Sequence, residues 1–408
     1  MKIPVRNIIN LPLEKAKSLL NGYKIKEIEI NDSAFLDNYI TNYQVDEINE
    51  IVTLYVNNRL KNSFTLDKEI KYVNNLGFVT GEDSINKELF KISHIGSTDL
   101  GICIDNKENC LFLYGDSFSG KDCNKGMWNS NFIAKSINKE FSSNIYFKEI
   151  ISYDNKLVKP IIQGQHDENL ELNLDINNHK EVTKIPTGGI RIDDDVYIFY
   201  MSVRYWGKPG EWFVTENQLI KAKYYDLKNF KKVENVNFKC SDSEQFGQIY
   251  PFLNNDDEEY IYLLANPGGR FGNTCLLKVK KVDIEHKDKY LILTKNKEFK
   301  SLLETNKDDY FYILNHDHSS EGSIIFNPYL NKWIISNLDE DGINFYLSDS
   351  LLDEFKEKIK VINFDKFPLL YGGFINECMM DNDGKRMFMQ VSQWSPIYNT
   401  SLFEIVFN

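Results

Sequence analysis

The residues GSTDLGICIDNKENCLFLYGDSFSG (96–120) contain two short apolar runs on either side of a polar turn. Apolar runs of this length, separated by turn-forming residues, predict two antiparallel strands joined as a β-hairpin. Asp99 stands at the start of the first run, and Asp116 stands at the end of the second. The hairpin is therefore expected to carry one carboxylate on each strand, both at its open end.

The same layout occurs four more times along the chain. Each segment has a short strand, a polar turn and a strongly apolar strand, and a further strand follows after a variable loop. These segments are residues 187–203, 246–269, 321–341 and 372–394. Hairpins that recur about every 60 residues, without convincing helices between them, predict an all-β fold of the five-bladed β-propeller class. A β-sandwich is the alternative.

Composition limits the classes of function that the chain can have. Its 408 residues are enough for one large or two unequal domains, and its 13% aromatic content suits a fold rich in strands. A net charge of −12 argues against nucleic acid or an anionic membrane surface as the main partner, because both require basic surfaces. No apolar run is long enough to span a membrane, and the first residues lack a signal-peptide pattern. Localisation and export route stay open.

The sequence predicts neither a cofactor nor a metal site. The six cysteines are scattered without a CxxC motif, which favours free and partly buried thiols. His316 and His318 have the alternate spacing of a metal-binding pair on a strand, but no third ligand is evident, so an exposed loop is favoured.

The first 60 residues differ from the repeated part. A helical stripe from Pro12 to Leu20 is followed by strand-like runs at residues 23–30 and 50–56. This unit weakly resembles the PASTA module of penicillin-binding proteins and their kinases, although the Pro and Gly that usually precede the last strand are missing. The resemblance implies contact with peptidoglycan, and a plain structural appendage is the alternative. Residues 61–90 are expected to be a linker, and residues 91–408 to form the propeller.

Strand register predicts how the two aspartates lie. The turn of the first hairpin centres between Lys107 and Glu108, so Asp99 and Asp116 are expected to be directly opposed, with Cβ atoms roughly 4.5–5.5 Å apart. A one-residue bulge would break this register. Two close carboxylates drive their pKa values apart, as acid/base cleavage of a glycosidic bond requires. The alternative is that each aspartate caps a turn.

Further side chains are expected at the same strand ends. Glu321 has nearly the same offset from its turn as Asp99, which suggests a third carboxylate that acts as the acid or modulates the other two; a solvated glutamate is the alternative. Aromatic rings can stack on sugar rings, although they also serve in packing. Arginine side chains can bind sugar hydroxyl groups, although they also form structural ion pairs. The candidates for substrate binding are Trp128, Trp206, Trp394, Arg204 and Arg270, and Trp212 stands in a similar loop position.

Several ordered motifs resemble one bacterial propeller family. It was long described as a domain of unknown function and is now partly assigned to the endo-D-arabinofuranases, glycoside hydrolases that cut D-arabinan in mycobacterial cell walls. The motifs are TDLG (98–101), YGDSF (114–118), W-x-SN-x-x-A-x-S (128–136), IPTGGI (185–190), YxxYMSVRYWG (197–207), NPGGRFG (266–272), EGSIxxNPYLxxW (321–333), YGGFI (371–375) and SQWSPxYN (392–399).

The resemblance implies a five-bladed propeller with an acidic active-site funnel. The family's catalytic carboxylates correspond to Asp99, Asp116 and Glu321, and its W-x-SN motif places Asn131 beside the substrate. Asn129 stands where many relatives carry Arg, so the contact there is expected to differ. A polysaccharide substrate is implied, with D-arabinan as one option, and so is action at the cell envelope or outside the cell. The alternatives are a non-catalytic glycan-binding propeller and a component of a phage or envelope assembly.

Overall fold

The structure of the chain is a computed structural model. It describes residues 8–9, 11–30, 40–57, 63–105, 109–137, 144–151, 158–164, 181–316 and 318–408, and every structural statement below concerns these residues. The predicted turn at Lys107 and Glu108 lies outside them. Within the described part, no helix has both the length and the apolar character needed to cross a membrane.

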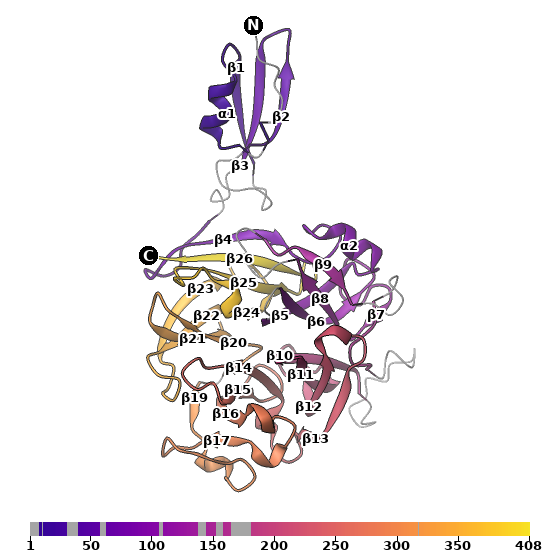
Figure 1. The fold of residues 1–408 in the computed structure, drawn as a ribbon, viewed down its shortest axis with the longest axis vertical. Helices are drawn as coiled ribbons and strands as arrows, with labels where there is room; N and C mark the ends of the chain where they lie inside the picture. Colours follow the sequence, from indigo (N-terminus) through magenta and orange to yellow (C-terminus); the bar gives the residue numbers. More distant parts are fainter. Residues whose placement is uncertain are drawn as a thin grey trace.

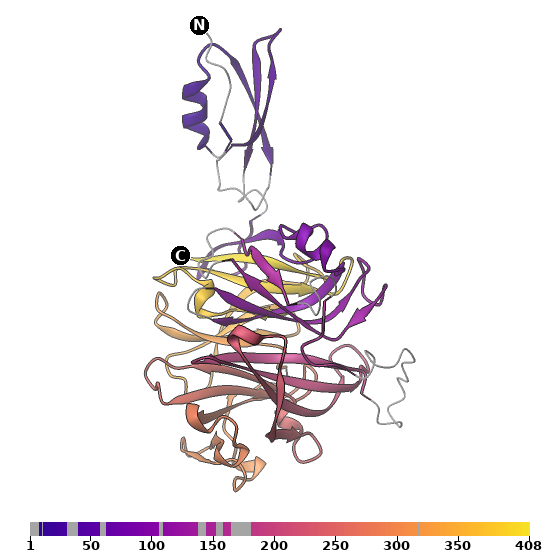
Figure 2. The same ribbon diagram turned by 45° about the vertical axis from the view of Figure 1, so that its right-hand side comes forward.

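The N-terminal residues form a small unit of one helix and three strands, which stands apart from the other sheets in Figures 1 and 2. Its elements are α1 (Leu13–Leu19), β1 (Lys24–Ile30), β2 (Ile40–Asp46) and β3 (Ile51–Asn57). The central strand β3 pairs parallel to β1 and antiparallel to β2. Alternate residues of β3, Val52 and Leu54, are buried with Ala16 of the helix. The predicted helix and both predicted strands are therefore present.

The first repeated hairpin builds what is here called sheet one, which follows the helix α2 (Lys87–Ile92). Its strands are β5 (Ser97–Asp105), β6 (Cys110–Phe118), β7 (Trp128–Asn129), β8 (Phe132–Ser136) and β9 (Phe147–Ile150). The strand order is β5-β6-β8-β9, and β7 also pairs with β6. Strand β6 is buried over its whole length, as its continuous apolar run predicts.

The other four repeats form sheets two to five, each built on an antiparallel hairpin. Sheet two contains β10 (Thr183–Ile192), β11 (Asp195–Tyr205), β12 (Phe213–Lys223) and β13 (Lys231–Lys239). Sheet three contains β14 (Gln248–Leu253), β15 (Tyr260–Asn266), β16 (Thr274–Lys280), β17 (Leu291–Leu293), β18 (Phe299–Ser301) and β19 (Tyr312–Leu314). Sheet four contains β20 (Ser323–Asn327), β21 (Lys332–Leu338), β22 (Gly342–Ser348) and β23 (Glu357–Asn363). Sheet five contains β24 (Leu370–Phe374), β25 (Arg386–Gln393), β26 (Asn399–Phe407) and β4 (Ile70–Phe78).

A short turn joins the hairpin strands of sheet two, as the sequence predicts. In sheet two the register runs to Ile192 and Asp195, which leaves a two-residue turn in which Asp193 has a left-handed φ of +50°. The helical segments within sheets two to five are single 3₁₀ turns, namely η2 (Tyr224–Asp226), η3 (Glu244–Phe246), η4 (Lys281–Asp283), η5 (Lys287–Lys289), η6 (Lys307–Asp309) and η7 (Glu377–Met379).

The five sheets follow one another around a closed, propeller-like arrangement. Strand β4 comes from before sheet one, yet it pairs with the C-terminal strand β26 and so completes sheet five. The first strands of successive sheets also touch, because β5 contacts β10 and β24, and β14 contacts β10 and β20. Sheet five is thus both the last sheet and the neighbour of sheet one, as Figure 1 shows. Pairing with β4 covers the edge of β26 that would otherwise be exposed.

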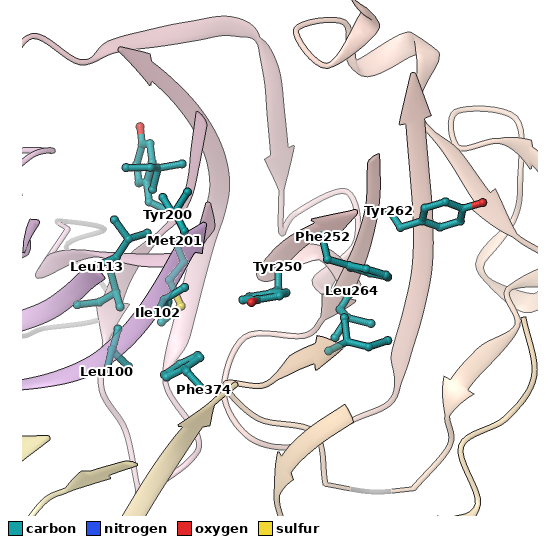
Figure 3. Close-up of a cluster of buried hydrophobic side chains, with 14 of the residues drawn as sticks. Leu100, Ile102, Leu113, Tyr200, Met201, Tyr250, Phe252, Tyr262, Leu264 and Phe374 are labelled. Carbon is teal, nitrogen blue, oxygen red and sulfur yellow. The ribbon is translucent and has the colours of Figure 1, made fainter. Parts of the chain in front are cut away.

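Apolar side chains from several sheets fill the space between them. The largest cluster includes Leu100 and Ile102 of β5, Tyr250 of β14 and Phe374 of β24, which come near one another in Figure 3. Cores of this kind are close-packed, so the strands that they join are held in fixed relative positions. The strand ends that carry the candidate catalytic residues therefore rest on a common core.

Candidate active site

Asp99 lies at an irregular point of the first hairpin. The predicted register is found on both sides of it, with Thr98 opposite Ser117 and Ile102 opposite Leu113. Between them the register shifts, and Leu100 pairs with Tyr114. Asp99 consequently faces two residues of β6 rather than one. The prediction that Asp99 and Asp116 are directly opposed is wrong, because a β-bulge interrupts the ladder there.

The bulge is produced by left-handed backbone at Leu100 and Gly101, whose φ angles are +73° and +109°. A non-glycine residue in this region costs roughly 1–2 kcal/mol, so other contacts must hold it. Sheet five supplies them. The Leu100 amide donates to Ser392 Oγ at 2.7 Å, and a Cβ on residue 101 would lie 2.5 Å from Gln390 Oε1. Gly101 is therefore required at this position, and the bulge re-aims Asp99.

The Asp99 carboxylate is held against β6 by close packing. Tyr371 donates a hydrogen bond to Asp99 Oδ2 at 2.8 Å. Asp99 Oδ1 is buried without a hydrogen-bond partner among the described residues, and it lies 2.5 Å from where a Cβ on Gly115 would be. Burial raises the pKa of Asp99 to about 6, and the negative charge of Glu321 adds to the rise. The residue as a whole keeps partial exposure.

Asp116 has a different environment. It is buried at the end of β6, and its Oδ1 accepts a hydrogen bond from Trp128 Nε1 at 2.9 Å and another from Thr183 Oγ1 at 2.6 Å. Thr183 begins β10, so sheet two helps to orient the carboxylate of sheet one. Two donors on one oxygen fix the orientation of the Asp116 carboxylate.

Glu321 is joined to Asp99 through two intervening side chains. Arg270 Nε and Nη2 donate to Glu321 Oε2 and Oε1 at 3.1 Å and 3.0 Å, which is a bidentate ion pair. The guanidinium lies 4.8 Å from the ring centre of Tyr371, which in turn donates to Asp99. Arg270 therefore forms an ion pair with a carboxylate, which is one of the two roles predicted for it from the sequence; the other is binding of sugar hydroxyl groups. In this pair both oxygens of Glu321 accept a hydrogen bond from Arg270.

Aromatic rings form a row along sheets one and five. The Trp128 ring lies 5.7 Å from Phe118, Phe118 lies 5.9 Å from Tyr398, and Tyr398 lies 5.6 Å from Trp394. Trp394 ends the row with 52% of its surface exposed. Since Trp128 also binds Asp116, the row runs from the candidate catalytic group to an exposed ring. Aromatic faces of this kind bind sugar rings by stacking.

Arg204 and Trp206 lie at the end of β11, on the side of sheet two. Trp206 is 37% exposed and meets Trp212 edge to face at 6.1 Å. The Trp212 ring also lies 5.1 Å from the guanidinium of Arg270, which connects this pair to the carboxylate network. Arg204 Nε is buried and has no hydrogen-bond partner within the described ranges.

Asn131 serves the protein backbone. Its Nδ2 donates to the carbonyl groups of Ile162 and Lys184 at 3.0 Å and 2.8 Å. Its Oδ1 accepts from the amides of Ile161 and Ile162 at 2.7 Å and 3.2 Å. These bonds use both donors and both acceptor positions of the amide. We therefore interpret Asn131 as a positioning residue that attaches residues 161–162 to β10, rather than as a contact to substrate.

The two spaced histidines make separate contacts. His316 stacks on Tyr346 at 4.9 Å, and His318 Nε2 lies 3.3 Å from Glu340. Asp317 between them lies outside the described residues. Among those that are described, the side chains grouped closely enough to hold a metal ion are three cysteines at the other end of the β5–β6 hairpin.

Three site residues were missed as candidates. Tyr371 and Tyr398 lie beside the carboxylates on the side of sheet five, and Thr183 donates a hydrogen bond to Asp116. All three stand at or next to the start of a strand, which is the position that drew attention to Asp99. The sequence signal that marks Asp99 therefore also marks these three residues.

Comparison with known proteins gives one family match. A family model described as a domain of unknown function, DUF4185, matches residues 84–404. No curated protein matches the sequence. A solved candidate hydrolase from Bacteroides ovatus ATCC 8483 is similar over 82% of this chain and 90% of its own, with a TM-score of 0.54 and 11% identity. At that identity the likeness shows the fold.

Two glycoside hydrolases are among the other similar structures, at TM-scores below 0.5. A family 117 enzyme from Zobellia galactanivorans has a TM-score of 0.44 and 8% identity, over 84% of this chain and 92% of its own. The GH43_1 enzyme from Xanthomonas citri, in complex with xylotriose, has a TM-score of 0.43 and 8% identity, over 78% of this chain and 88% of its own.

Proposed function

Because the chain belongs to the DUF4185 family, whose description assigns no function, we propose from its site that it is a glycoside hydrolase acting on a polysaccharide. The observation that carries the proposal is the pair of carboxylates on one hairpin in unlike environments. Burial raises the pKa of Asp99 to about 6, whereas Asp116 accepts two hydrogen bonds at one oxygen. Hydrolysis of a glycosidic bond needs one group that donates a proton and a second that attacks or activates water.

We assign the role of general acid to Asp99. A carboxyl group with a pKa near 6 is partly protonated near neutral pH and can protonate the oxygen of the leaving sugar. Asp116, oriented by Trp128 and Thr183, then serves as the nucleophile or as the base that takes a proton from water. The proton that Asp99 gives up is recovered from water when the cycle ends.

Glu321 acts through Arg270 in this scheme. The bidentate pair fixes the guanidinium beside the Tyr371 ring, and Tyr371 donates to Asp99. The positive charge of Arg270 opposes the rise in the Asp99 pKa, and Glu321 partly cancels that charge. The third carboxylate therefore sets how readily Asp99 gives up its proton.

The aromatic rings suggest a chain-like substrate. Trp394 and Trp206 are exposed on sheets five and two, and Trp128 binds Asp116, whereas Phe118 and Tyr398 within the row are buried. Several stacking positions suit a polymer that is cut internally. Together with the motif resemblance, this supports a furanoside such as D-arabinan, and the finer proposal is an endo-D-arabinofuranase.

The architecture fits the same proposal. We take the five sheets to be the blades of a five-bladed propeller, because each is an antiparallel sheet and their first strands touch in sequence order. We take residues 1–60 to be a separate PASTA-like module that contacts peptidoglycan. Within residues 61–90, the linking part is the stretch before β4, because β4 already belongs to sheet five. The enzyme would then act on cell-envelope polysaccharide.

Product analysis tests the proposal. The full chain is incubated with purified cell-wall polysaccharides, including D-arabinan, and with xylan as a comparison, and the products are separated by chromatography and identified by mass. A ladder of furanose oligosaccharides is expected from D-arabinan. Binding to a glycan without release of new reducing ends would instead identify a non-catalytic glycan-binding protein.

A further inference from the structure

Three cysteines that are far apart in the sequence meet where sheet one contacts sheet five. Cys103 lies on β5, Cys110 begins β6, and Cys378 lies in η7 between β24 and β25. Their sulfur atoms all lie within 4.8 Å of one another. Cys378 is central, with its Sγ 2.9 Å from that of Cys110 and 3.4 Å from that of Cys103.

The backbone around the cluster is held by side-chain hydrogen bonds. Asn376 Oδ1 accepts from the amide of Cys378 at 3.1 Å, and Asn376 Nδ2 donates to the carbonyl of Cys103 at 3.2 Å. One asparagine thus fixes two of the three cysteines across the contact between the sheets. The amide of Cys110 donates to Ser136 Oγ at 2.8 Å. The three sulfur atoms are therefore presented by backbone that is already fixed.

We propose that Cys103, Cys110 and Cys378 form a binding site for one thiophilic d¹⁰ cation, Cu⁺ or Zn²⁺. Thiolates are the ligands that select these ions. At a metal–sulfur distance of about 2.3 Å, three sulfur atoms around one ion lie roughly 4 Å apart. Cys378 Sγ, now 2.9 Å and 3.4 Å from the other two, would therefore move away from them by roughly 1 Å when an ion enters. No histidine or carboxylate of the described residues joins the group, so the coordination is three sulfur atoms, to which Zn²⁺ would add a solvent ligand.

Binding of the ion requires loss of protons. Each thiol that becomes a ligand releases its proton to solvent, and the cation offsets the resulting negative charge. Because each thiol must lose its proton before it binds the ion, protons compete with the ion for the sulfur atoms. Affinity should therefore increase with pH. Cys378 is partly exposed, whereas the other two are buried, and it provides the entry path.

The presence of three thiols distinguishes this site from a redox-active pair of cysteines. A disulfide between Cys110 and Cys378 would use two of the three sulfur atoms, release two protons and two electrons to an oxidant, and leave Cys103 beside the bond. Convergence of all three on a common point suits a single shared ion better. Such an ion would join sheets one and five at the opposite end of β5 from the contact between Asp99 and Tyr371.

The test is titration of the reduced full chain, without oxygen, with Cu⁺ or with Zn²⁺ in separate arms. One equivalent of at least one ion is expected to remain bound in native mass spectrometry, and Cu⁺ should add thiolate-to-copper absorbance in the ultraviolet. Cys103→Ser, Cys110→Ser and Cys378→Ser should each weaken binding by at least roughly tenfold. Cys240→Ser is the matched control, because Cys240 lies outside the cluster, and it should bind normally.

A second measurement does not depend on folding of the variants. In the wild-type chain, the bound ion should slow alkylation of the partly exposed Cys378 relative to the ion-free chain, and it should leave the alkylation rate of Cys240 unchanged. Asn376→Ala should keep the stoichiometry and lower the affinity roughly 10- to 100-fold, as loss of an orienting partner does. Failure of both ions to bind would overturn the proposal. Unchanged binding in the three serine variants would overturn it as well. So would a chain that binds no ion and still has a mass two hydrogen atoms too low after reduction, which would indicate a disulfide.

Discussion

Replacement of Asp99 by asparagine should change how stability depends on pH. The pKa of Asp99 is about 6 in the folded protein, against an ordinary value of 3.8. The folded state therefore binds the proton more tightly than the unfolded state, so the wild-type protein loses stability as pH rises from about 4 to about 6. A difference of about two pKa units corresponds to about 3 kcal/mol. An asparagine side chain cannot ionise, so the variant lacks this loss.

The amide of the variant adds a cost that does not vary with pH. Its NH₂ group would lie where Asp99 Oδ1 is now buried without a partner, which costs about 1–3 kcal/mol. The quantity to measure is therefore the change with pH in the free energy of unfolding of the variant relative to wild type. That difference should move in favour of the variant by about 2.5 kcal/mol between pH 4 and pH 8, because part of the change falls below pH 4.

Urea unfolding of both proteins at five pH values between 4 and 8 gives this difference. Asp193→Asn is the matched control, because Asp193 is an exposed aspartate in the β10–β11 turn and its replacement removes the same charge. A difference for Asp99→Asn that stays constant across the range would refute the claim that burial disfavours the charged form of Asp99. A difference that moves in favour of the wild type as pH rises would refute it as well.

Further predictions concern the network around Asp99. In Gly115→Ala the new Cβ would lie 2.5 Å from Asp99 Oδ1 and must displace it, so activity should fall roughly 10- to 100-fold in steady-state assays, and full activity would contradict the packing described. In Arg270→Gln the largely buried Glu321 loses its ion pair, which should cost up to about 3–5 kcal/mol in urea unfolding, and the double variant with Glu321→Gln should recover part of this. If Asp99 is the acid, kcat/KM should fall about tenfold per pH unit above pH 6, and a flat profile between pH 6 and pH 8 would exclude that role.

The sequence predicted the local structure of the site better than its long-range contacts. The apolar runs and turns located the strands, and the register inferred from them holds at Thr98 and Ile102. It fails at Asp99 because the bulge depends on Ser392 and Gln390, which lie nearly 300 residues away in the chain. Local pattern contains no information on such partners.

The same limit applies to the side chains that connect different sheets. Arg270 and Glu321 were both identified as site residues, yet their pairing depends on sheets three and four being neighbours. The cysteines were interpreted as scattered free thiols because no two stand in a CxxC motif. Their convergence follows from the closure that brings sheet five, which carries Cys378, against sheet one.

The central claim is that Asp99 and Asp116 together cleave a glycosidic bond. The most direct test is the rate of release of new reducing ends from D-arabinan and other furanose polymers by the wild-type chain, Asp99→Asn and Asp116→Asn, with near-ultraviolet circular dichroism to confirm that each variant is folded. The wild type is expected to hydrolyse the polymer, and both folded variants are expected to do so at a rate at least about 10³-fold lower. Folded variants that hydrolyse at nearly the wild-type rate would contradict it.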